Sequence, residues 1–134
     1  DRCGVKPLFW YESGEEILLS SEIKGILAVE RVPRAISPDY LSGAMFGAFT
    51  FASSAIEGIR AVKPGHFLII DQGRAPVEQP YWEMKFPVQQ NMTFKEARDQ
   101  VRDLFTKAVR RRMVADVPVG TYLSGGLDST LVCG

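Results

Sequence analysis

The pattern of apolar and polar positions changes period along the chain, and each period predicts a different element. Two short apolar runs, residues 8–11 and 17–19, flank the turn-forming pair Ser13-Gly14 and predict a β-hairpin. Apolar residues at positions 23, 26 and 27 then follow at helical spacing. The first 27 residues therefore predict a hairpin followed by a short helix.

A second helix is predicted from Ser37-Pro38-Asp39 to about Phe46 or Phe49. Serine caps a helix N-terminus, proline is tolerated in the first turn, and aspartate suits its positive end. We expect Tyr40, Leu41 and Met45 to face inward, and Phe46, Phe49 and Phe51 to pack in a core.

The middle of the chain predicts a loop, two extended segments and a linker. Residues 50–65 form the loop, which ends in a Pro64-Gly65 turn. Residues 66–70 predict a short strand and residues 77–82 another extended segment. Residues 84–92 mix charge, proline and glutamine without a period, which is typical of an interdomain linker.

The longest periodic segment follows this linker. Thr93 and Glu96 form a capping box, and apolar residues then recur at three- and four-residue steps, which predicts a helix over residues 94–114. Arg110, Arg111 and Arg112 fall in its last turn, where cations stabilise the negative helix end. Residues 117–123 predict a strand buried on both faces.

Composition excludes several classes of protein. Sixteen Lys+Arg balance 16 Asp+Glu, so the net charge of zero favours neither a nucleic-acid nor an anionic-membrane partner. No apolar run approaches the ~18–20 residues that a membrane span needs. Two cysteines at opposite ends, Cys3 and Cys133, form no disulfide framework or metal spacing and indicate a cytoplasmic protein. We expect Cys3 to be a small buried hydrophobe.

The strongest chemical signal is the run Ser124-Gly125-Gly126-Leu127-Asp128-Ser129 after the predicted strand. Glycines let the backbone turn tightly and approach a phosphate, and a helix N-terminus supplies unpaired N–H groups. The serine hydroxyls can donate to phosphate oxygens, and Asp128 beside a polyanion implies a bridging Mg²⁺. The alternative is a glycine-rich turn that binds no ligand.

This run resembles the pyrophosphatase loop of enzymes that cleave ATP between its α and β phosphates. The segments around it, which include Asp1-Arg2-Cys3-Gly4-Val5-Lys6-Pro7-Leu8, Glu57-Gly58-Ile59, Pro64-Gly65-His66 and Asp116-Val117-Pro118-Val119-Gly120, extend the likeness over nearly the whole chain. Together they resemble glutamine-dependent asparagine synthetases of class B.

The resemblance implies an α/β fold in two parts. Residues 1–83 would be the α+β end of an N-terminal-nucleophile glutaminase domain and residues 84–92 a linker. Residues 93–134 would open an adenine-nucleotide α-hydrolase-like parallel α/β domain with its first helix, strand and phosphate loop. Because the chain begins at Asp1 and stops inside an apolar run, we expect a piece of a longer protein, inactive by itself.

The resemblance also implies the ligands. Leu123 to Ser129 would hold ATP and its pyrophosphate, with Leu123 offering backbone contacts and Asp128 holding Mg²⁺ directly or through water. The small-molecule partners would be ATP, aspartate and glutamine, and the full-length protein would be a homodimer. No catalytic residue is expected in this segment, because the family's N-terminal cysteine nucleophile lies outside it. Cys3 cannot replace it, since a first-residue nucleophile needs its own free amine.

Three alternatives stay open at this point. A β-lactam synthetase-like or other related amidotransferase would share these motifs, and its distinguishing residues lie mostly outside this window. NAD and GMP synthetases share the loop, but the segment ahead of residue 93 argues against them. A non-catalytic, truncated remnant is the third. His66, the single histidine, has no nucleophile or carboxylate pattern beside it and is interpreted as structural.

Overall fold

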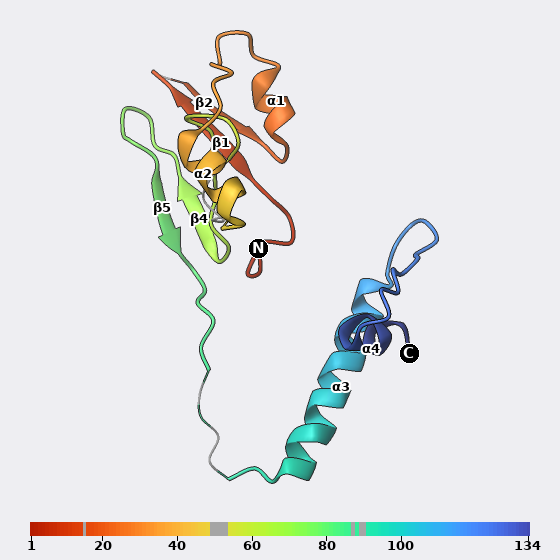
Figure 1. Cartoon of the computed structure of the whole chain (residues 1–134). Coiled ribbons are helices and arrows are strands. Elements are labelled where there is room, and N and C mark those ends of the chain that lie inside the picture. The colour runs from red at the N-terminus through yellow and green to blue at the C-terminus, as the bar shows by residue number, and fades with distance from the viewer. Residues whose placement is uncertain (15, 49–53, 87, 89–90) are drawn as a thin grey trace. The chain divides into compact units, whose positions relative to one another are not determined.

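The computed structural model describes residues 1–14, 16–48, 54–86, 88 and 91–134. These residues form two compact units, Asp1–Lys85 and Phe86–Gly134 (Figure 1). Strands lie in the first unit and the longest helix lies in the second. The mixed α/β composition expected from the sequence is confirmed, and both described sheets are antiparallel.

The first sheet has the strand order β2-β1-β3. Strand β1 (Phe9–Ser13) pairs antiparallel with β2 (Glu16–Ser20), with Trp10 opposite Leu19, so the predicted hairpin is confirmed. Strand β3 (Arg60–Ala61) adds to the other edge of β1. It falls within residues expected to form a loop, because two residues are too few to show an alternating pattern.

The second sheet is a two-stranded hairpin. Strand β4 (His66–Ile69) pairs antiparallel with β5 (Val77–Pro80), and Leu68 lies opposite Glu78. The turn before β4 is fixed by Gly65, whose carbonyl oxygen accepts from the backbone N–H groups of Tyr81 and Trp82. The sequence predicted both extended segments.

The core of the first unit lies where helix α1 (Ile23–Leu27) packs near the first sheet. Ile26, Val32 and Ile59 are 1–3% exposed and form its centre. Residues packed against this centre are partly buried: Phe9, Tyr11, Leu18, Ile23, Leu27, Val29 and Ile56. Burial of these apolar side chains is the main favourable term for this small unit.

Helix α2 (Pro38–Phe46) begins where the sequence predicted. Ser37 caps it, since the Ser37 hydroxyl accepts from the backbone N–H of Tyr40. It ends at Gly47, whose φ of 66° is left-handed. The predicted inward orientation is wrong for Leu41 and Met45, and the predicted core position is wrong for Phe46, because these side chains are 54%, 77% and 83% exposed. Helical spacing marks residues that share a face, and the described residues of the unit do not cover this one. Phe49 and Phe51 lie outside the described residues.

Residues 1–6 form a loop around the carboxylate of Asp1. Its two oxygens accept from the backbone N–H groups of Cys3, Val5 and Lys6 at 2.9–3.2 Å. The prediction that Cys3 is buried is wrong, because this loop turns its backbone toward the carboxylate and leaves the Cys3 side chain exposed.

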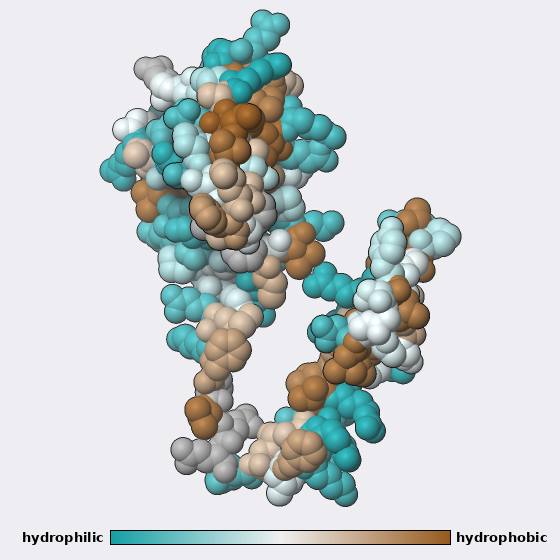
Figure 2. Space-filling model, in the orientation of Figure 1, coloured by the Kyte–Doolittle hydropathy of each residue, from teal (hydrophilic) through white to brown (hydrophobic). Residues whose placement is uncertain are grey.

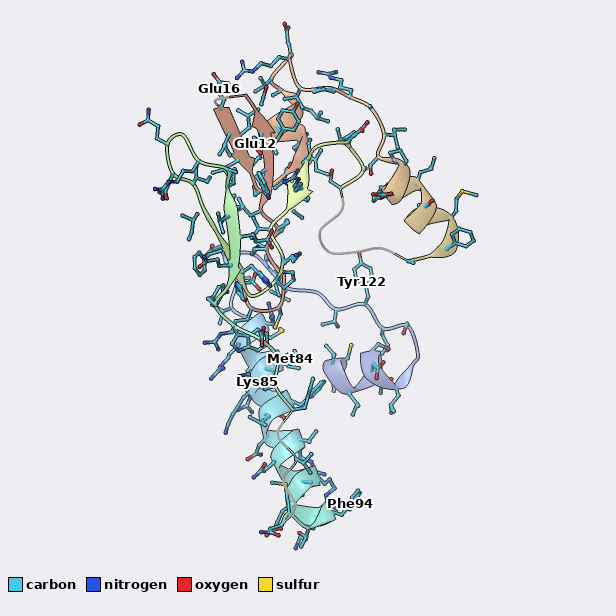
Figure 3. All side chains as sticks on the ribbon, turned by 90° about the vertical axis from the view of Figure 1, so that its left-hand side faces the viewer. Glu12, Glu16, Met84, Lys85, Phe94 and Tyr122 are labelled. Carbon is cyan, nitrogen blue, oxygen red and sulfur yellow. The ribbon has the colours of Figure 1, made fainter. Side chains whose placement is uncertain are left out.

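Helix α3 (Phe94–Arg112) dominates the second unit, and its start is visible at Phe94 in Figure 3. The predicted capping box is confirmed: Glu96 N–H donates to the Thr93 hydroxyl, and Thr93 N–H donates to a Glu96 carboxylate oxygen. The three arginines 110–112 occupy the last turn as predicted. Helix α4 (Leu127–Cys133) completes the described elements of this unit.

The strand predicted over residues 117–123 is wrong: none of these residues is in a strand, and all are exposed. A strand of the parallel type needs neighbouring strands, and the described residues of this unit supply none. Apolar residues along α3 and the segment before α4 are consequently on the surface (Figure 2), with Val101 and Leu104 64% and 66% exposed. The parallel α/β domain stays a prediction.

Candidate functional site

The candidate site is the loop that runs from Leu123 into the first turn of α4. Gly125 has a φ of 80°, a conformation that residues with a Cβ rarely adopt, and an added Cβ there would meet open space. Gly126 is the N-cap of α4, and its Cβ would come near only the Ser124 hydroxyl. The left-handed conformation of the turn thus favours glycine at 125.

The structure brings the two predicted serines together. Ser124 Oγ lies 3.0 Å from Ser129 Oγ, although the residues are five apart in sequence. The Ser129 hydroxyl is also 3.0 Å from the Gly126 carbonyl oxygen, to which it donates. Ser124 Oγ accepts weakly from Gly126 N–H at 3.4 Å. Two hydroxyl groups thereby converge on one side of a tight, exposed loop.

Asp128 lies in the first turn of α4 and is exposed. No group of three or more metal-ligand side chains occurs among the described residues. Mg²⁺ is commonly held by one or two carboxylates together with substrate phosphates, so a single exposed carboxylate next in sequence to Ser129 has the donor chemistry that this ion accepts. The donor set therefore suits a magnesium–polyphosphate complex better than a magnesium ion held by protein alone.

Leu123 and Leu127 are 64% and 76% exposed, and the structure does not bring their side chains into the serine pair. Sequence reasoning missed Thr130, whose hydroxyl donates to the Gly126 carbonyl oxygen at 2.8 Å. The sequence could have indicated this bond, because a serine or threonine in a helix can donate to the carbonyl oxygen four residues earlier, and Gly126 lies four residues before Thr130. Thr130 therefore helps to hold the N-cap residue of α4, Gly126, in place.

One carboxyl group in this unit has a shifted pKa. The hydroxyl of Thr93, followed by its backbone N–H, donates to Glu96 and lowers the pKa of that carboxyl below its ordinary 4.5. The group is fully exposed and belongs to the start of α3, so the shift reports the capping box and no catalytic role.

The remaining candidates have local explanations. His66 is half-buried at the start of β4, and its Nδ1 lies 2.8 Å from the Pro64 carbonyl oxygen. The arginines at 110–112 are exposed at the C-terminal end of α3. No helix in the described part of the chain is long and apolar enough to cross a membrane.

The fold and the loop define a two-unit α/β protein with an antiparallel first unit and a serine–glycine loop in the second. Comparison with known families agrees with this division. Residues 1–82 match the family model described as a glutamine amidotransferase domain, and residues 100–134 match the one described as asparagine synthase. The chain belongs to the glutamine amidotransferase domain family, and its resemblance to glutamine-hydrolysing asparagine synthetases is confirmed.

Individual relatives cover the whole chain. It is 36% identical over 135 residues to an asparagine synthetase (glutamine-hydrolyzing) 3 of Bacillus subtilis, which aligns with 98% of this chain and 22% of the relative. It is 33% identical over 139 residues to amidase chry2 of Gibberella zeae, across 100% of this chain and 20% of the relative. A putative asparagine synthetase (glutamine-hydrolyzing) 2 of Methanocaldococcus jannaschii is 34% identical over 140 residues, which are 100% of this chain and 27% of the relative. The chain spans about a fifth to a quarter of the length of these relatives.

Proposed function

We propose that this chain is part of an ATP-dependent amidotransferase that makes asparagine from aspartate, with ammonia taken from glutamine. The observation that carries the proposal is the Ser124–Ser129 loop following a glutamine amidotransferase domain in one chain. A phosphate-binding loop alone would fit many nucleotide enzymes, whereas this combination calls for both an ammonia source and an activated acid.

The proposed reaction has three balanced steps. Water hydrolyses glutamine to glutamate and ammonia in the first domain. A carboxylate oxygen of aspartate attacks the α-phosphorus of ATP, so that an aspartyl-adenylate forms and pyrophosphate leaves. Ammonia then attacks the activated carbonyl carbon, AMP leaves, and a proton is released to solvent as the amide forms.

The residues of this chain would act on the leaving pyrophosphate. Ser124 and Ser129 would exchange their mutual hydrogen bond for bonds to phosphate oxygens, while Gly125 and Gly126 would let the backbone approach. Asp128 would hold Mg²⁺, which neutralises negative charge on the phosphates when bound. Leu123 would offer its backbone to the adenine nucleotide, and Leu127 would complete the turn.

A direct test is pyrophosphate release from ATP by the complete gene product, with and without aspartate. We expect release that requires aspartate, and a loss of about tenfold or more in Ser129→Ala, because a hydrogen bond to a charged group is removed. Ser42→Ala, on exposed helix α2, is the matched control and should keep full activity. Absence of aspartate-dependent release in the unaltered protein would refute the proposal.

A second candidate is a related amidotransferase that amidates another acid. The observation in its favour is the similarity to amidase chry2 over the whole chain. The same assay separates the two: release stimulated by another carboxylic acid and not by aspartate would favour the second candidate. A cytoplasmic location and a homodimer are further proposals, which fractionation of cells and light scattering would test.

A further inference from the structure

Two side-chain hydrogen bonds join residues 121–124 to helix α4. The first is the Ser124–Ser129 pair within the loop. The second lies further from the loop tip: the thiol of Cys133, the last residue of α4, donates to Thr121 Oγ1 at 3.2 Å. These two residues are 12 apart in sequence, so their contact joins the residues that precede the loop to the end of α4.

The Thr121–Cys133 contact matters because little else fixes this segment. Residues 117–123 have no strand partner among the described residues. Val119 to Thr121 form one wall of a groove of about 540 Å³, whose other lining residues include Phe105 and Val109 of α3 and Leu131 of α4. Apolar contacts of this kind are non-directional, whereas a hydrogen bond has a preferred length and angle.

We propose that Thr121 and Cys133 are positioning residues of the phosphate loop. Their hydrogen bond sets the spacing between the segment that carries Ser124 and the helix that carries Ser129, and so keeps both hydroxyls directed at one polyphosphate. This inference rests on the proposed function. It concerns ATP binding and assigns neither residue a contact with the nucleotide.

The chemistry predicts a graded set of variants. A thiol is a weak hydrogen-bond donor, so its loss in Cys133→Ala should raise the KM for ATP only about two- to fivefold. Cys133→Ser keeps a donor at the same place and should retain most of the affinity. Thr121→Val removes the acceptor at nearly constant shape and should match Cys133→Ala. Because the contact acts equally before and during the reaction, kcat should stay constant.

The test is a double-mutant cycle in the complete gene product, read as the KM for ATP in pyrophosphate release. The double variant should be no worse than either single variant, because both remove the same bond. Cys3→Ser alters the other free cysteine, in the first unit, and should leave the KM unchanged. Additive effects, or single variants with an unaltered KM, would overturn the inference while leaving the proposed function intact.

A second readout does not depend on activity. The rate of alkylation of Cys133 by N-ethylmaleimide, followed by mass spectrometry with Cys3 as internal reference, should rise in Thr121→Val because the thiol loses its partner. An unchanged ratio would overturn the inference even in a protein that releases no pyrophosphate. If the protein releases no pyrophosphate but the alkylation rate of Cys133 relative to Cys3 still rises, the Thr121–Cys133 contact is supported. In that case the proposed function fails and the contact does not.

Discussion

At the scale of single residues, the first unit depends on a glycine where three segments meet. Gly65 has a φ of 71°, and its backbone N–H donates to the Asp1 carbonyl oxygen. Its own carbonyl oxygen accepts from Tyr81 and Trp82. A Cβ at this position would collide with the Trp82 carbonyl oxygen, which is backbone and cannot rotate away. The position is therefore constrained by conformation and by space.

Gly65→Ala should destabilise the first unit by more than the usual cost of an alanine in a left-handed backbone conformation. We expect a loss of about 2–4 kcal/mol, because backbone strain and a steric collision add. Gly73→Ala is the matched control, since Gly73 has a φ of 73° with nothing near its missing Cβ; its cost should be only about 1 kcal/mol. Urea denaturation measures both, and equal losses would contradict this explanation.

At the scale of elements, the start of α3 is held by one reciprocal pair, and that pair has a pH dependence. Hydrogen bonds from Thr93 lower the pKa of Glu96 in the folded state below its ordinary 4.5. The bond therefore stabilises the helix start fully above the ordinary pKa, and the stabilisation is lost as the pH falls through the lowered pKa.

The Thr93 backbone amide reports this loss directly. We expect its NMR chemical shift to stay constant from pH 7 to about 5 and then move with an apparent pKa below 4.5. In Glu96→Gln the shift should be flat, because the group that titrates is gone while the side chain can still accept. A midpoint above 4.5 would contradict the hydrogen-bond assignment.

The elements also show which features could be predicted from sequence. Helix starts at Ser37 and Thr93 were predictable because caps act within three residues, and the structure confirms both. The burial of side chains could not be predicted, because it depends on segments that are distant in sequence. Met45 has the spacing of a buried helix position, and residues 117–123 have the pattern of a buried strand. No element among the described residues covers either, so both are exposed. For the site, the sequence indicated the serines of the loop, whereas the Thr121–Cys133 contact appears only once the chain is folded.

At the scale of the whole molecule, the chain is organised as two units joined near residue 85. Met84 and Phe86 are 58% and 82% exposed, and the described residues around them form neither helix nor strand (Figure 3). Extended, exposed backbone is the preferred substrate of proteases, because it fits their sites without local unfolding.

Limited trypsin digestion should therefore cut first after Lys85. The expected early products separate residues 1–85 from the remainder, and intact-mass spectrometry identifies them. Lys85→Gln should delay this cut, whereas Lys24→Gln, within helix α1, should leave its rate unchanged. A first cut inside either unit would contradict the two-unit organisation.

We propose that one protein couples a glutaminase to an ATP-dependent amide synthesis. Incubation of the complete gene product with ATP, aspartate and glutamine labelled with ¹⁵N in its amide, followed by mass spectrometry, tests it most directly. We expect asparagine that carries the ¹⁵N label, formed only with ATP and with one AMP for each amide. Release of labelled ammonia with no labelled amide, or synthesis accompanied by ADP, would contradict it.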